Sequence, residues 1–326
     1  MPFFRNEEIC LLRILFEARG EFVSRQRLAQ AGNISQAELD KALSSYVAAG
    51  YPFESHPQRG ICLKEPPDIW CAEEIIARCP TSREGIAWDP LLLVETASTN
   101  DVAREQARKG AAAGFLVAAS RQTRGRGRLG RQWESPSGHG LYVSILLRPD
   151  LAAAEAGQLT ILGSVVMADA VESLSGFRPR IKWPNDLMWK DRKLAGLLIE
   201  TEREGARLAF AVAGMGINVR HGADDFSPEV KELATSLYLI TGQLYRRADL
   251  LVALLHAFEK RLGQPFAETR EAWAASSLTM GQQVILSTVR GSKQGQALGL
   301  DDSGALLLRN HSGQIEAVTA GDMQAV

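Results

Sequence analysis

Short apolar runs alternate with turns through the middle of the chain, and this pattern limits the fold more than any other feature. Runs of strand length occur at residues 91–95, 115–119, 141–147, 181–199 and 208–213, the fourth broken by turns at 184–186 and 190–192. A helix is expected after Ser98, and an apolar stretch at 159–174 predicts a buried helix. Strands that follow one another through short turns tend to pair in antiparallel fashion. The sequence therefore predicts an α+β domain built on a largely antiparallel sheet.

The first 63 residues predict a separate small module. Helical spacing and end signals predict helices over 7–18, 24–32 and 35–50, followed by two short strands within 51–63. The third helix has the clearest start, since Ser35 and Glu38 form a capping box. Three helices and a hairpin make a winged helix-turn-helix, a module that most often places its second turn helix in the major groove of DNA.

Charge argues against strong DNA binding by one copy of this module. Residues 1–64 contain eight Lys or Arg and seven Asp or Glu, and the expected recognition helix opens with Gln36, Glu38 and Asp40. Because DNA affinity depends largely on neutralising phosphates, such a module binds weakly as a monomer. A dimer that presents two modules to a two-fold operator would bind better. A protein-binding module is the alternative.

Composition excludes several classes of protein. The 326 residues include 37 basic and 38 acidic side chains, so the whole chain is not a polycation that attracts nucleic acid or membrane. All four cysteines precede residue 80 and none forms a CxxC pair, which excludes a zinc ribbon and a redox pair. No uncharged apolar run reaches the roughly 18 residues that a membrane span needs. We expect a cytoplasmic protein with reduced thiols and no membrane partner.

The segment 121–131 carries the strongest chemical signal. It has five arginines in eleven residues, with Gly125, Gly127 and Gly130 between them. Arginine forks bind carboxylates and phosphates, and glycine lets backbone N–H groups approach the same anion. We expect a ligand-binding loop whose arginines repel one another and which stays mobile until an anion arrives.

Motifs of other nucleotide-binding proteins and of hydrolases are either absent or lack the structural context they need. The three glycines satisfy GxGxxG, but a dinucleotide site needs a helix directly after them, which Pro136, Gly138 and Gly140 prevent. The chain contains no Gly-Lys dipeptide, which excludes a P-loop, and it has neither GxSxG nor HExxH.

A second group of polar residues lies at expected strand ends and turns. It comprises KWPND at 182–186 and RKLAG at 192–196, and the small residues of GMGIN at 214–218 end a later strand. Several cations, glycine-rich backbone and Asp186 without an enzyme nucleophile suit attack of a substrate carboxylate on the α-phosphate of ATP. Mg²⁺ would assist the pyrophosphate leaving group.

Together these segments resemble the bacterial biotin-protein ligases. The resemblance rests on Ser98-Thr99-Asn100, on GRGRLGR at 125–131 and on the KWPND, RKLAG and GMGIN segments. With the winged helix it covers essentially the full chain and extends to members that also repress the biotin operon. It implies formation of biotinyl-5′-AMP from biotin and ATP, then transfer of biotin to a lysine of the biotin carboxyl carrier protein of acetyl-CoA carboxylase. It also implies operator binding by a homodimer, with biotinyl-5′-AMP as corepressor.

The resemblance implies three domains. These are a winged helix-turn-helix at 1–65, a catalytic mixed-sheet domain similar to class II aminoacyl-tRNA synthetases at 66–278, and an SH3-like domain at 279–326. The last segment by itself alternates short apolar runs with glycines at 291, 295, 304 and 313, which we interpret as turns of a small β-barrel.

The resemblance also implies roles for particular residues. Ser98, Thr99, Asn100 and Gln122 would surround the biotin rings, Gly125, Arg126, Gly127 and Arg128 would order over the carboxylate and adenylate, and Lys193 and Gly196 would lie at the acyl-phosphate end. Lys182, Asp186 and Asn218 would belong to the nucleotide, metal and catalytic surroundings. The expected catalytic residues are Lys182, Asp186, Arg128 and Lys193. Asp186 would orient or deprotonate the incoming lysine amine, or act through Mg²⁺.

Three points stay open. Lipoate or octanoyl transfer through a thioester would need a cysteine nucleophile in the catalytic domain, and all four cysteines precede residue 80. An ATP-dependent lipoate ligase remains an alternative. So does a DNA-binding protein that senses biotin without catalysis. Family members that act as repressors place an aromatic ring over adenine in a loop matching 233–237, where this chain has Ala234.

Overall fold

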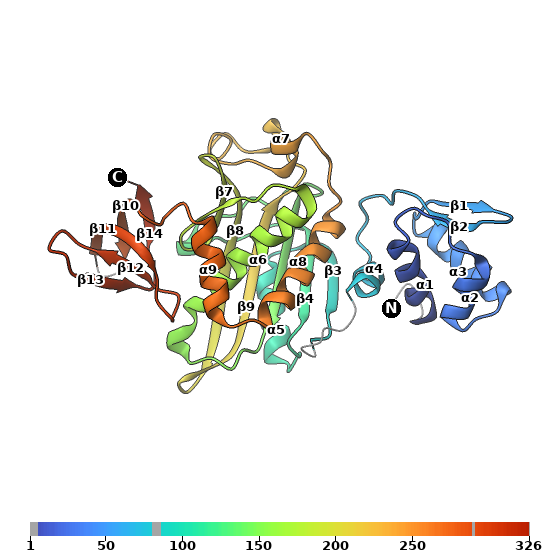
Figure 1. Cartoon of the computed structure of the whole chain (residues 1–326), viewed down its shortest axis with the longest axis horizontal. Helices are drawn as coiled ribbons and strands as arrows, with labels where there is room; N and C mark the ends of the chain where they lie inside the picture. Colours follow the sequence, from blue (N-terminus) through green and yellow to red (C-terminus); the bar gives the residue numbers. More distant parts are fainter. Residues whose placement is uncertain (1–5, 80–85, 289–290, 326) are drawn as a thin grey trace.

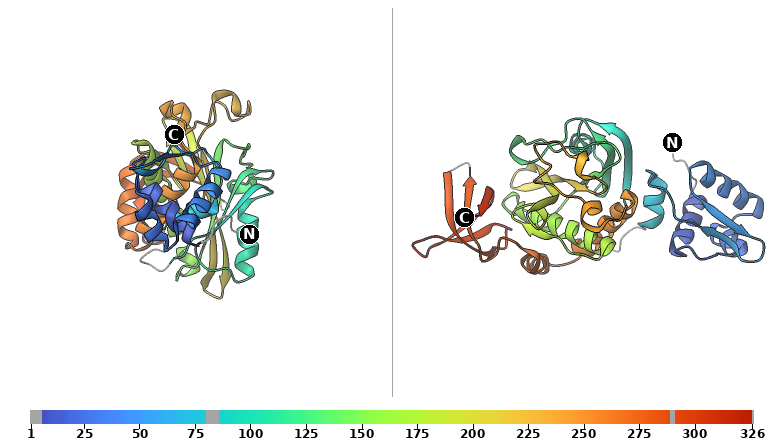
Figure 2. Two further views of the ribbon diagram at one scale, coloured as in Figure 1. Left: turned by 90° about the vertical axis from the view of Figure 1, so that its right-hand side faces the viewer. Right: turned by 90° about the horizontal axis from the view of Figure 1, so that it is seen from above.

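The computed structural model describes residues 6–79, 86–288 and 291–325, and they form three parts along the long axis of the molecule (Figure 1). A helical N-terminal part and a small C-terminal sheet lie at opposite ends of a larger central part, as the second view in Figure 2 also shows. No helix in these ranges is long and apolar enough to cross a membrane.

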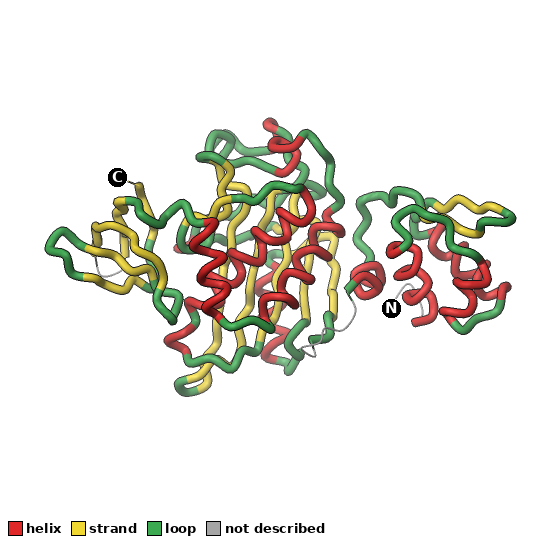
Figure 3. The backbone as a smooth tube through the Cα atoms, in the orientation of Figure 1, coloured by secondary structure: helices red, strands yellow, loops and turns green. Residues whose placement is uncertain are grey.

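The N-terminal part contains the three helices and the hairpin that the sequence predicts. They are α1 (Asn6–Glu17), α2 (Arg25–Gly32), α3 (Gln36–Ala48), β1 (Phe53–His56) and β2 (Gly60–Leu63). Ser24 caps α2, and the capping box of Ser35 and Glu38 opens α3. Figure 3 shows the three helices beside the hairpin. Leu11, Leu28 and other apolar side chains of this part form a buried core of their own.

A short helix joins this part to the central one. Helix α4 spans Ala72–Arg78. Its Ala77 belongs to the N-terminal core, whereas its Ile75 belongs to the central core. Helix α4 therefore packs on both parts.

The central part is a seven-stranded mixed sheet, mostly antiparallel as predicted. Its strands are β3 (Asp89–Thr96), β4 (Phe115–Gln122), β5 (Gly140–Leu147), β6 (Arg180–Lys182), β7 (Asp186–Trp189), β8 (Arg192–Glu204) and β9 (Arg207–Asn218), in the order β3-β4-β5-β9-β8-β7-β6. Only β3 and β4 run parallel, because α5 (Thr99–Arg108) connects them. All other neighbours are antiparallel.

Helices cover both faces of this sheet. Helices α6 (Gly157–Ser175), α8 (Arg247–Leu262) and α9 (Phe266–Ser276) cover one face, and α5 covers the other (Figures 1 and 2). Residues of β4 alternate accordingly, since Leu116 and Ala118 join the core below α6 and Val117 joins that below α5. The sequence predicted α6, but not α8, α9 or the short α7 (Leu237–Thr241).

The C-terminal part is an antiparallel sheet and not the closed barrel that the sequence predicts. Its strands are β10 (Gln283–Thr288), β11 (Gly291–Leu300), β12 (Leu306–Arg309), β13 (Ile315–Val318) and β14 (Asp322–Ala325), in the order β13-β12-β11-β10-β14. Within the described residues the edge strands β13 and β14 do not pair, so the sheet stays open. Gly304 and Gly313 lie in turns as predicted, but Gly295 lies inside β11 because its backbone pairs with Val284.

Candidate functional site

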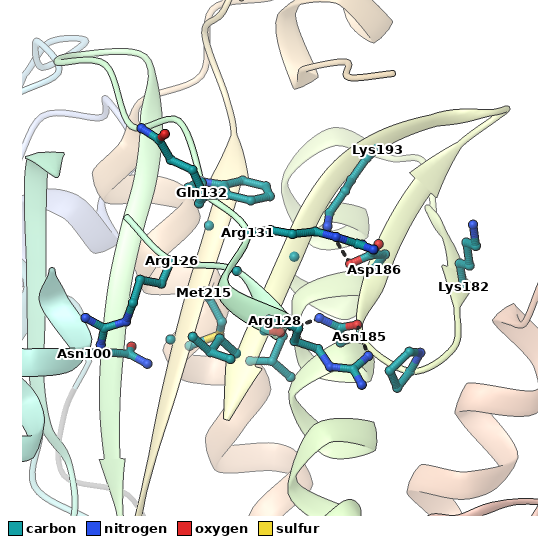
Figure 4. A pocket seen from close by; sticks show the side chains of 18 of the residues that line it. Asn100, Arg126, Arg128, Arg131, Gln132, Lys182, Asn185, Asp186, Lys193 and Met215 are labelled. Carbon is teal, nitrogen blue, oxygen red and sulfur yellow. Dashed lines mark hydrogen bonds and ion pairs between the residues drawn. The ribbon is translucent and has the colours of Figure 1, made fainter. Parts of the chain in front are cut away.

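A cavity of about 240 Å³ opens where the arginine-glycine loop meets β7, β8, β9 and the start of β14 (Figure 4). Most of the predicted site residues line it, namely Ser98, Thr99, Asn100, Gln122, Arg126, Gly127, Arg128, Lys182, Asp186, Lys193 and Gly196. Gly125 and Asn218 do not line it. The structure therefore brings together segments that are far apart in the sequence.

One end of the cavity has a polar, uncharged floor. Gln122 Oε1 accepts hydrogen bonds from the backbone N–H of Thr99 (2.9 Å) and from its hydroxyl (3.1 Å). Gln122 Nε2 donates to Ser135 Oγ (3.0 Å). Ser144, buried below the floor, donates to Asn100 Oδ1 (2.6 Å). These bonds fix the orientation of both amides, so the floor presents a set of neutral donors and acceptors in fixed positions.

The arginine-glycine loop folds back on itself beside this floor. Gly127 N donates to Arg131 O (2.7 Å), and Trp133 N donates to Gly125 O (3.0 Å). A Cβ atom on Gly125 would lie 2.4 Å from Trp133 O, so this crossing requires glycine. The tip between the two bonds is a short 3-10 helix, η1 (Arg128–Gly130). Gly125 thus shapes the loop and does not face the ligand space.

The arginines of this loop have partners across the fold. Arg121 pairs with Glu95, Arg126 with Asp101 and Glu200, and Arg131 with Asp322, while Arg128 donates to Asn185 Oδ1 and to Gly321 O. The Arg126 guanidinium lowers the pKa of the Asp101 carboxyl below its ordinary value. Burial lowers the pKa of Arg128, although two nearby carboxylates oppose that shift. Carboxylates from other segments therefore pair with three of the five arginines and offset part of the repulsion that the sequence predicts, although the nearby Arg131 still contributes to lowering the pKa of Arg128.

A cationic end lies opposite the polar floor. Lys193 Nζ, on β8, lies 2.7 Å from Asp186 Oδ1 at the start of β7, and it lies 5.3 Å from the ring centroid of Trp133 (Figure 4). Lys182 pairs with Asp186 through the backbone of β6 and β7, and Figure 4 shows its ammonium group apart from the Lys193–Asp186 pair. A carboxylate or phosphate entering this end would meet the ammonium of Lys193 first.

Glycines in β9 make room for two larger side chains of the cavity. A Cβ atom on Gly216 would lie 2.4 Å from the Trp133 indole, and one on Gly214 would lie 2.0 Å from Asn100 Oδ1. The sequence predicted a strand end where backbone packs closely on a ligand. These glycines do line the cavity, but their closest neighbours are Trp133 and Asn100.

Asn218 lies behind the cavity wall. Its Nδ2 donates to Thr235 O (3.0 Å), and Thr235 N donates to Lys193 O (2.9 Å). Asn218 thus holds the 233–235 segment against the backbone of Lys193. Ala234 pairs with Lys193 through this bridge, and the aromatic ring that lies next to Lys193 is that of Trp133.

Several residues of the cavity escaped sequence reasoning. Trp133, Asn185, Met215, Asp322 and Met323 all line it. Trp133 could have been found, since it follows the arginine-glycine loop and is the next aromatic residue in the chain. Nothing local marks Asp322, which lies 191 residues beyond its partner Arg131.

The donor set fits a magnesium ion that arrives with a nucleotide. No group of three His, Cys, Asp or Glu side chains in the described ranges could hold a metal by itself. Mg²⁺ in nucleotide sites is usually held by one or two carboxylates together with phosphates and water. Asp186 and Asp322 supply the carboxylates of the cavity lining, and Asp322 is paired with Arg131.

The chain is similar to known proteins over most of its length. Residues 93–218 match the Biotin/lipoate A/B protein ligase family, and residues 279–325 match the Biotin protein ligase C terminal domain. The chain is 33% identical to the bifunctional ligase/repressor BirA of Bacillus spizizenii, over 96% of this chain and 97% of that protein. It is 34% identical to the biotin--[acetyl-CoA-carboxylase] ligase of Paracoccus denitrificans, over 68% of this chain and 95% of that protein.

Solved structures give the same relationship. The biotin protein ligase from Aquifex aeolicus in complex with biotin and ATP is 30% identical, with a TM-score of 0.62, over 72% of this chain and 97% of that chain. The similarity to the Bacillus protein extends over nearly the whole length of both chains. The chain therefore belongs to the biotin protein ligase family.

Proposed function

We propose that this protein activates biotin with ATP to biotinyl-5′-AMP and transfers biotin to a lysine of a biotin carboxyl carrier protein. The observation that carries the proposal is a single cavity with a neutral polar floor at one end and the Lys193 ammonium at the other. Biotin is complementary to both ends, since its ureido ring is neutral and polar and its tail ends in a carboxylate. Relatives named as biotin ligases support the assignment.

In the first step the chain positions two anions that would otherwise repel each other. The floor around Thr99 and Gln122 holds the ureido ring, and Lys193 holds the biotin carboxylate. Arg128 and the backbone N–H groups of the loop face the α-phosphate of ATP. The carboxylate oxygen forms a bond to that phosphorus, the bond to the bridging oxygen breaks, and pyrophosphate leaves. The protein contributes alignment and charge compensation.

Asp186, with the phosphates of ATP, would hold Mg²⁺, and the bound ion supplies positive charge that assists the departure of pyrophosphate. Lys182 lines the same end of the cavity and adds a further cation near the phosphates.

In the second step a lysine amine of the carrier attacks the acyl carbon of biotinyl-5′-AMP. A C–N bond forms, the bond from the acyl carbon to the phosphate oxygen breaks, and AMP leaves with the electron pair. Asp186 orients the amine and accepts its proton. The position of Asp186 beside Lys193 supports this role, because Lys193 marks the carboxyl end of biotin.

Pyrophosphate exchange separates this function from its alternatives. Exchange between pyrophosphate and ATP is measured with biotin and then with lipoate, and label is followed from biotin into an isolated biotin carrier domain. We expect exchange and transfer with biotin. Exchange with lipoate alone would identify a lipoate ligase, and biotin binding without exchange would identify a sensor.

We propose a second role as a biotin-responsive repressor, through a winged helix-turn-helix at 1–65. The helices and hairpin of that segment support it, as does the full-length similarity to proteins named bifunctional ligase/repressor. Arg25 on α2 pairs with Asp40 on α3, which compensates one acidic charge of the expected recognition helix. A gel shift with operator DNA at fixed salt, with and without biotinyl-5′-AMP, tests binding by a homodimer.

The domain assignment forms part of the same proposal. Residues 66–278 are the catalytic domain, similar to class II aminoacyl-tRNA synthetases, and 279–326 are an SH3-like domain whose sheet is open in the described residues. Contacts of Arg128 and Arg131 with Gly321 and Asp322 support a role for the last segment at the nucleotide end.

A further inference from the structure

Four charged side chains meet behind the polar floor of the cavity. Arg126 donates to both carboxylate oxygens of Asp101, through Nη1 (2.7 Å) and Nη2 (2.8 Å). Arg104 donates to Asp101 Oδ1 (2.6 Å) and to Glu200 Oε1 (3.4 Å). Two guanidinium groups and two carboxylates balance, so the cluster carries no net charge at pH 7.

Glu200 joins the floor of the cavity to the arginine-glycine loop. Its Oε2 accepts hydrogen bonds from Asn100 Nδ2 (2.6 Å) and from Arg126 Nη2 (3.3 Å). Asn100 and Arg126 line the same end of the cavity (Figure 4), whereas Glu200 lies behind them and does not line it. One carboxylate oxygen therefore holds a floor residue and a loop residue at once.

This contact leaves Asn100 a single orientation. A carboxylate only accepts hydrogen bonds, so the amide nitrogen of Asn100 must face Glu200. Its oxygen accepts from Ser144 on the other side (2.6 Å), and the backbone of Gly214 packs directly against the amide. The shape that Asn100 gives the floor is therefore set before any ligand enters.

The same contacts change the expected role of Arg126. Both terminal nitrogens of its guanidinium bond to carboxylates, those of Asp101 and Glu200, whereas the Lys193 ammonium faces one carboxylate, that of Asp186. A biotin carboxylate gains less from such a group than from Lys193. Arg126 instead anchors the start of the arginine-glycine loop to α5 and β8.

We infer that Glu200 is a positioning residue for biotin, which, together with Asp101, fixes the floor amide and the first part of the loop before substrate binds. This inference rests on the proposed function. Because Glu200 contacts Asn100 and Arg126 at the ureido end of the cavity, its loss acts chiefly on biotin, and it affects ATP only through the loop that faces the α-phosphate.

The test compares Glu200→Gln with Glu202→Gln. Glu202 lies two residues further along β8 and also pairs with an arginine of α5, Arg108, but it contacts neither Asn100 nor Arg126. The KM values for biotin and for ATP are measured by pyrophosphate exchange, and trypsin cleavage within residues 124–131 is measured without ligand. The melting temperature of each variant records any general loss of stability.

For Glu200→Gln we expect a biotin KM about ten-fold higher, as the loss of a charge-assisted hydrogen bond gives. We also expect a clearly smaller rise in the KM for ATP and faster cleavage of the loop. Glu202→Gln should match the wild type. Equal biotin KM and equal cleavage in the two variants would overturn the inference. If Glu200→Gln does not fold, Asp101→Asn is compared with Glu202→Gln in the same two measurements.

The two proposals fail differently. Absence of biotin-dependent exchange in the wild-type protein would remove the proposed function, although the trypsin comparison would still test whether Glu200 anchors the loop. Exchange in the wild type with no effect of Glu200→Gln or Asp101→Asn would remove the inference alone.

Discussion

The ammonium nitrogen of Lys193 lies 2.7 Å from Asp186 Oδ1 across the paired strands β7 and β8. Both side chains are partly exposed in the cavity, so this pair is accessible to substrate. A biotin carboxylate that binds Lys193 competes with Asp186 for the ammonium group. In the proposed transfer step, the carboxylate of Asp186 would then be available to the incoming lysine amine.

Asp186→Asn should separate the two steps of the reaction. The asparagine keeps the size of the side chain but accepts no proton, so transfer from preformed biotinyl-5′-AMP should slow by about 100-fold or more. Single-turnover transfer to a carrier domain measures this rate. Asp191→Asn, an exposed residue in the β7–β8 turn, is the control. Transfer at the wild-type rate by Asp186→Asn would exclude the proposed role of this carboxylate.

Lys193→Met should remove the preference of the cavity for biotin, whose tail ends in a carboxylate, over biotinamide. An ammonium–carboxylate hydrogen bond contributes about 1.5–3 kcal/mol, so biotin binding should weaken by roughly 10- to 150-fold. Binding of biotinamide, which has no carboxylate, should change little. Calorimetric titration with both ligands measures the difference, with Lys190→Met in the nearby turn as the control. Equal losses for biotin and biotinamide would show that Lys193 acts on the cavity in general and not on the charge.

Gly216→Ala should displace the Trp133 ring. The added methyl group would lie 2.4 Å from the indole, and overpacking of this kind costs about 1–3 kcal/mol. Urea unfolding and biotin affinity should both report the change, and Trp133→Leu in the same chain should restore part of the stability. Gly222→Ala is the control, since no atom lies closer than 3.3 Å to its Cβ position. Full stability of Gly216→Ala would mean that the indole moves at no cost.

Features that depend on residues close together in the sequence could be predicted from it. The capping box of Ser35 and Glu38 spans three residues, so it marks the start of α3 in the sequence itself. The turn between β7 and β8 is equally local. Local signals of this kind predicted the N-terminal helices and hairpin and most strands of the central sheet.

Other features depend on partners that the sequence does not bring together. Glu200 reaches Asn100 across 100 residues, and Asp322 reaches Arg131 across 191. The arginine cluster therefore marked a segment that lines the cavity, but it did not reveal the ion pairs of these arginines, because their carboxylate partners come from distant segments. Closure of the C-terminal sheet also depends on contacts between its edge strands β13 and β14, which local patterning does not specify.

Glu74→Ala should destabilise the contact between the N-terminal and central parts. Glu74 is fully buried and accepts hydrogen bonds from Tyr51, Arg78 and Arg246 at 2.7–3.0 Å. Removing one member of a buried ion cluster costs about 3–5 kcal/mol, because the remaining charges stay buried. Urea unfolding measures this loss, with the exposed Glu65→Ala as control. An unchanged free energy of unfolding for Glu74→Ala would contradict a stabilising role of the cluster.

The stability of the protein should fall on mild acidification because of His221. This side chain is 1% exposed, and its ring stacks on Phe226 with a centroid distance of 4.8 Å. Burial, followed by the nearby His139, lowers the pKa of His221 from 6.5 to about 4. Between these two values the unfolded chain binds a proton that the folded chain does not, so stability decreases as the pH falls from about 6.5 towards 4.

His221→Gln removes this titration and isolates its contribution. Between pH 7 and pH 5 the wild type should lose about 2 kcal/mol more than His221→Gln, whereas His311→Gln, an exposed residue, should follow the wild type. Urea unfolding at several pH values gives both curves. Because wild type and variant share the other titratable groups, the difference between the curves reports on His221 together with its coupling to His139. Parallel curves would mean that His221 accepts its proton in the folded state as readily as in the unfolded chain.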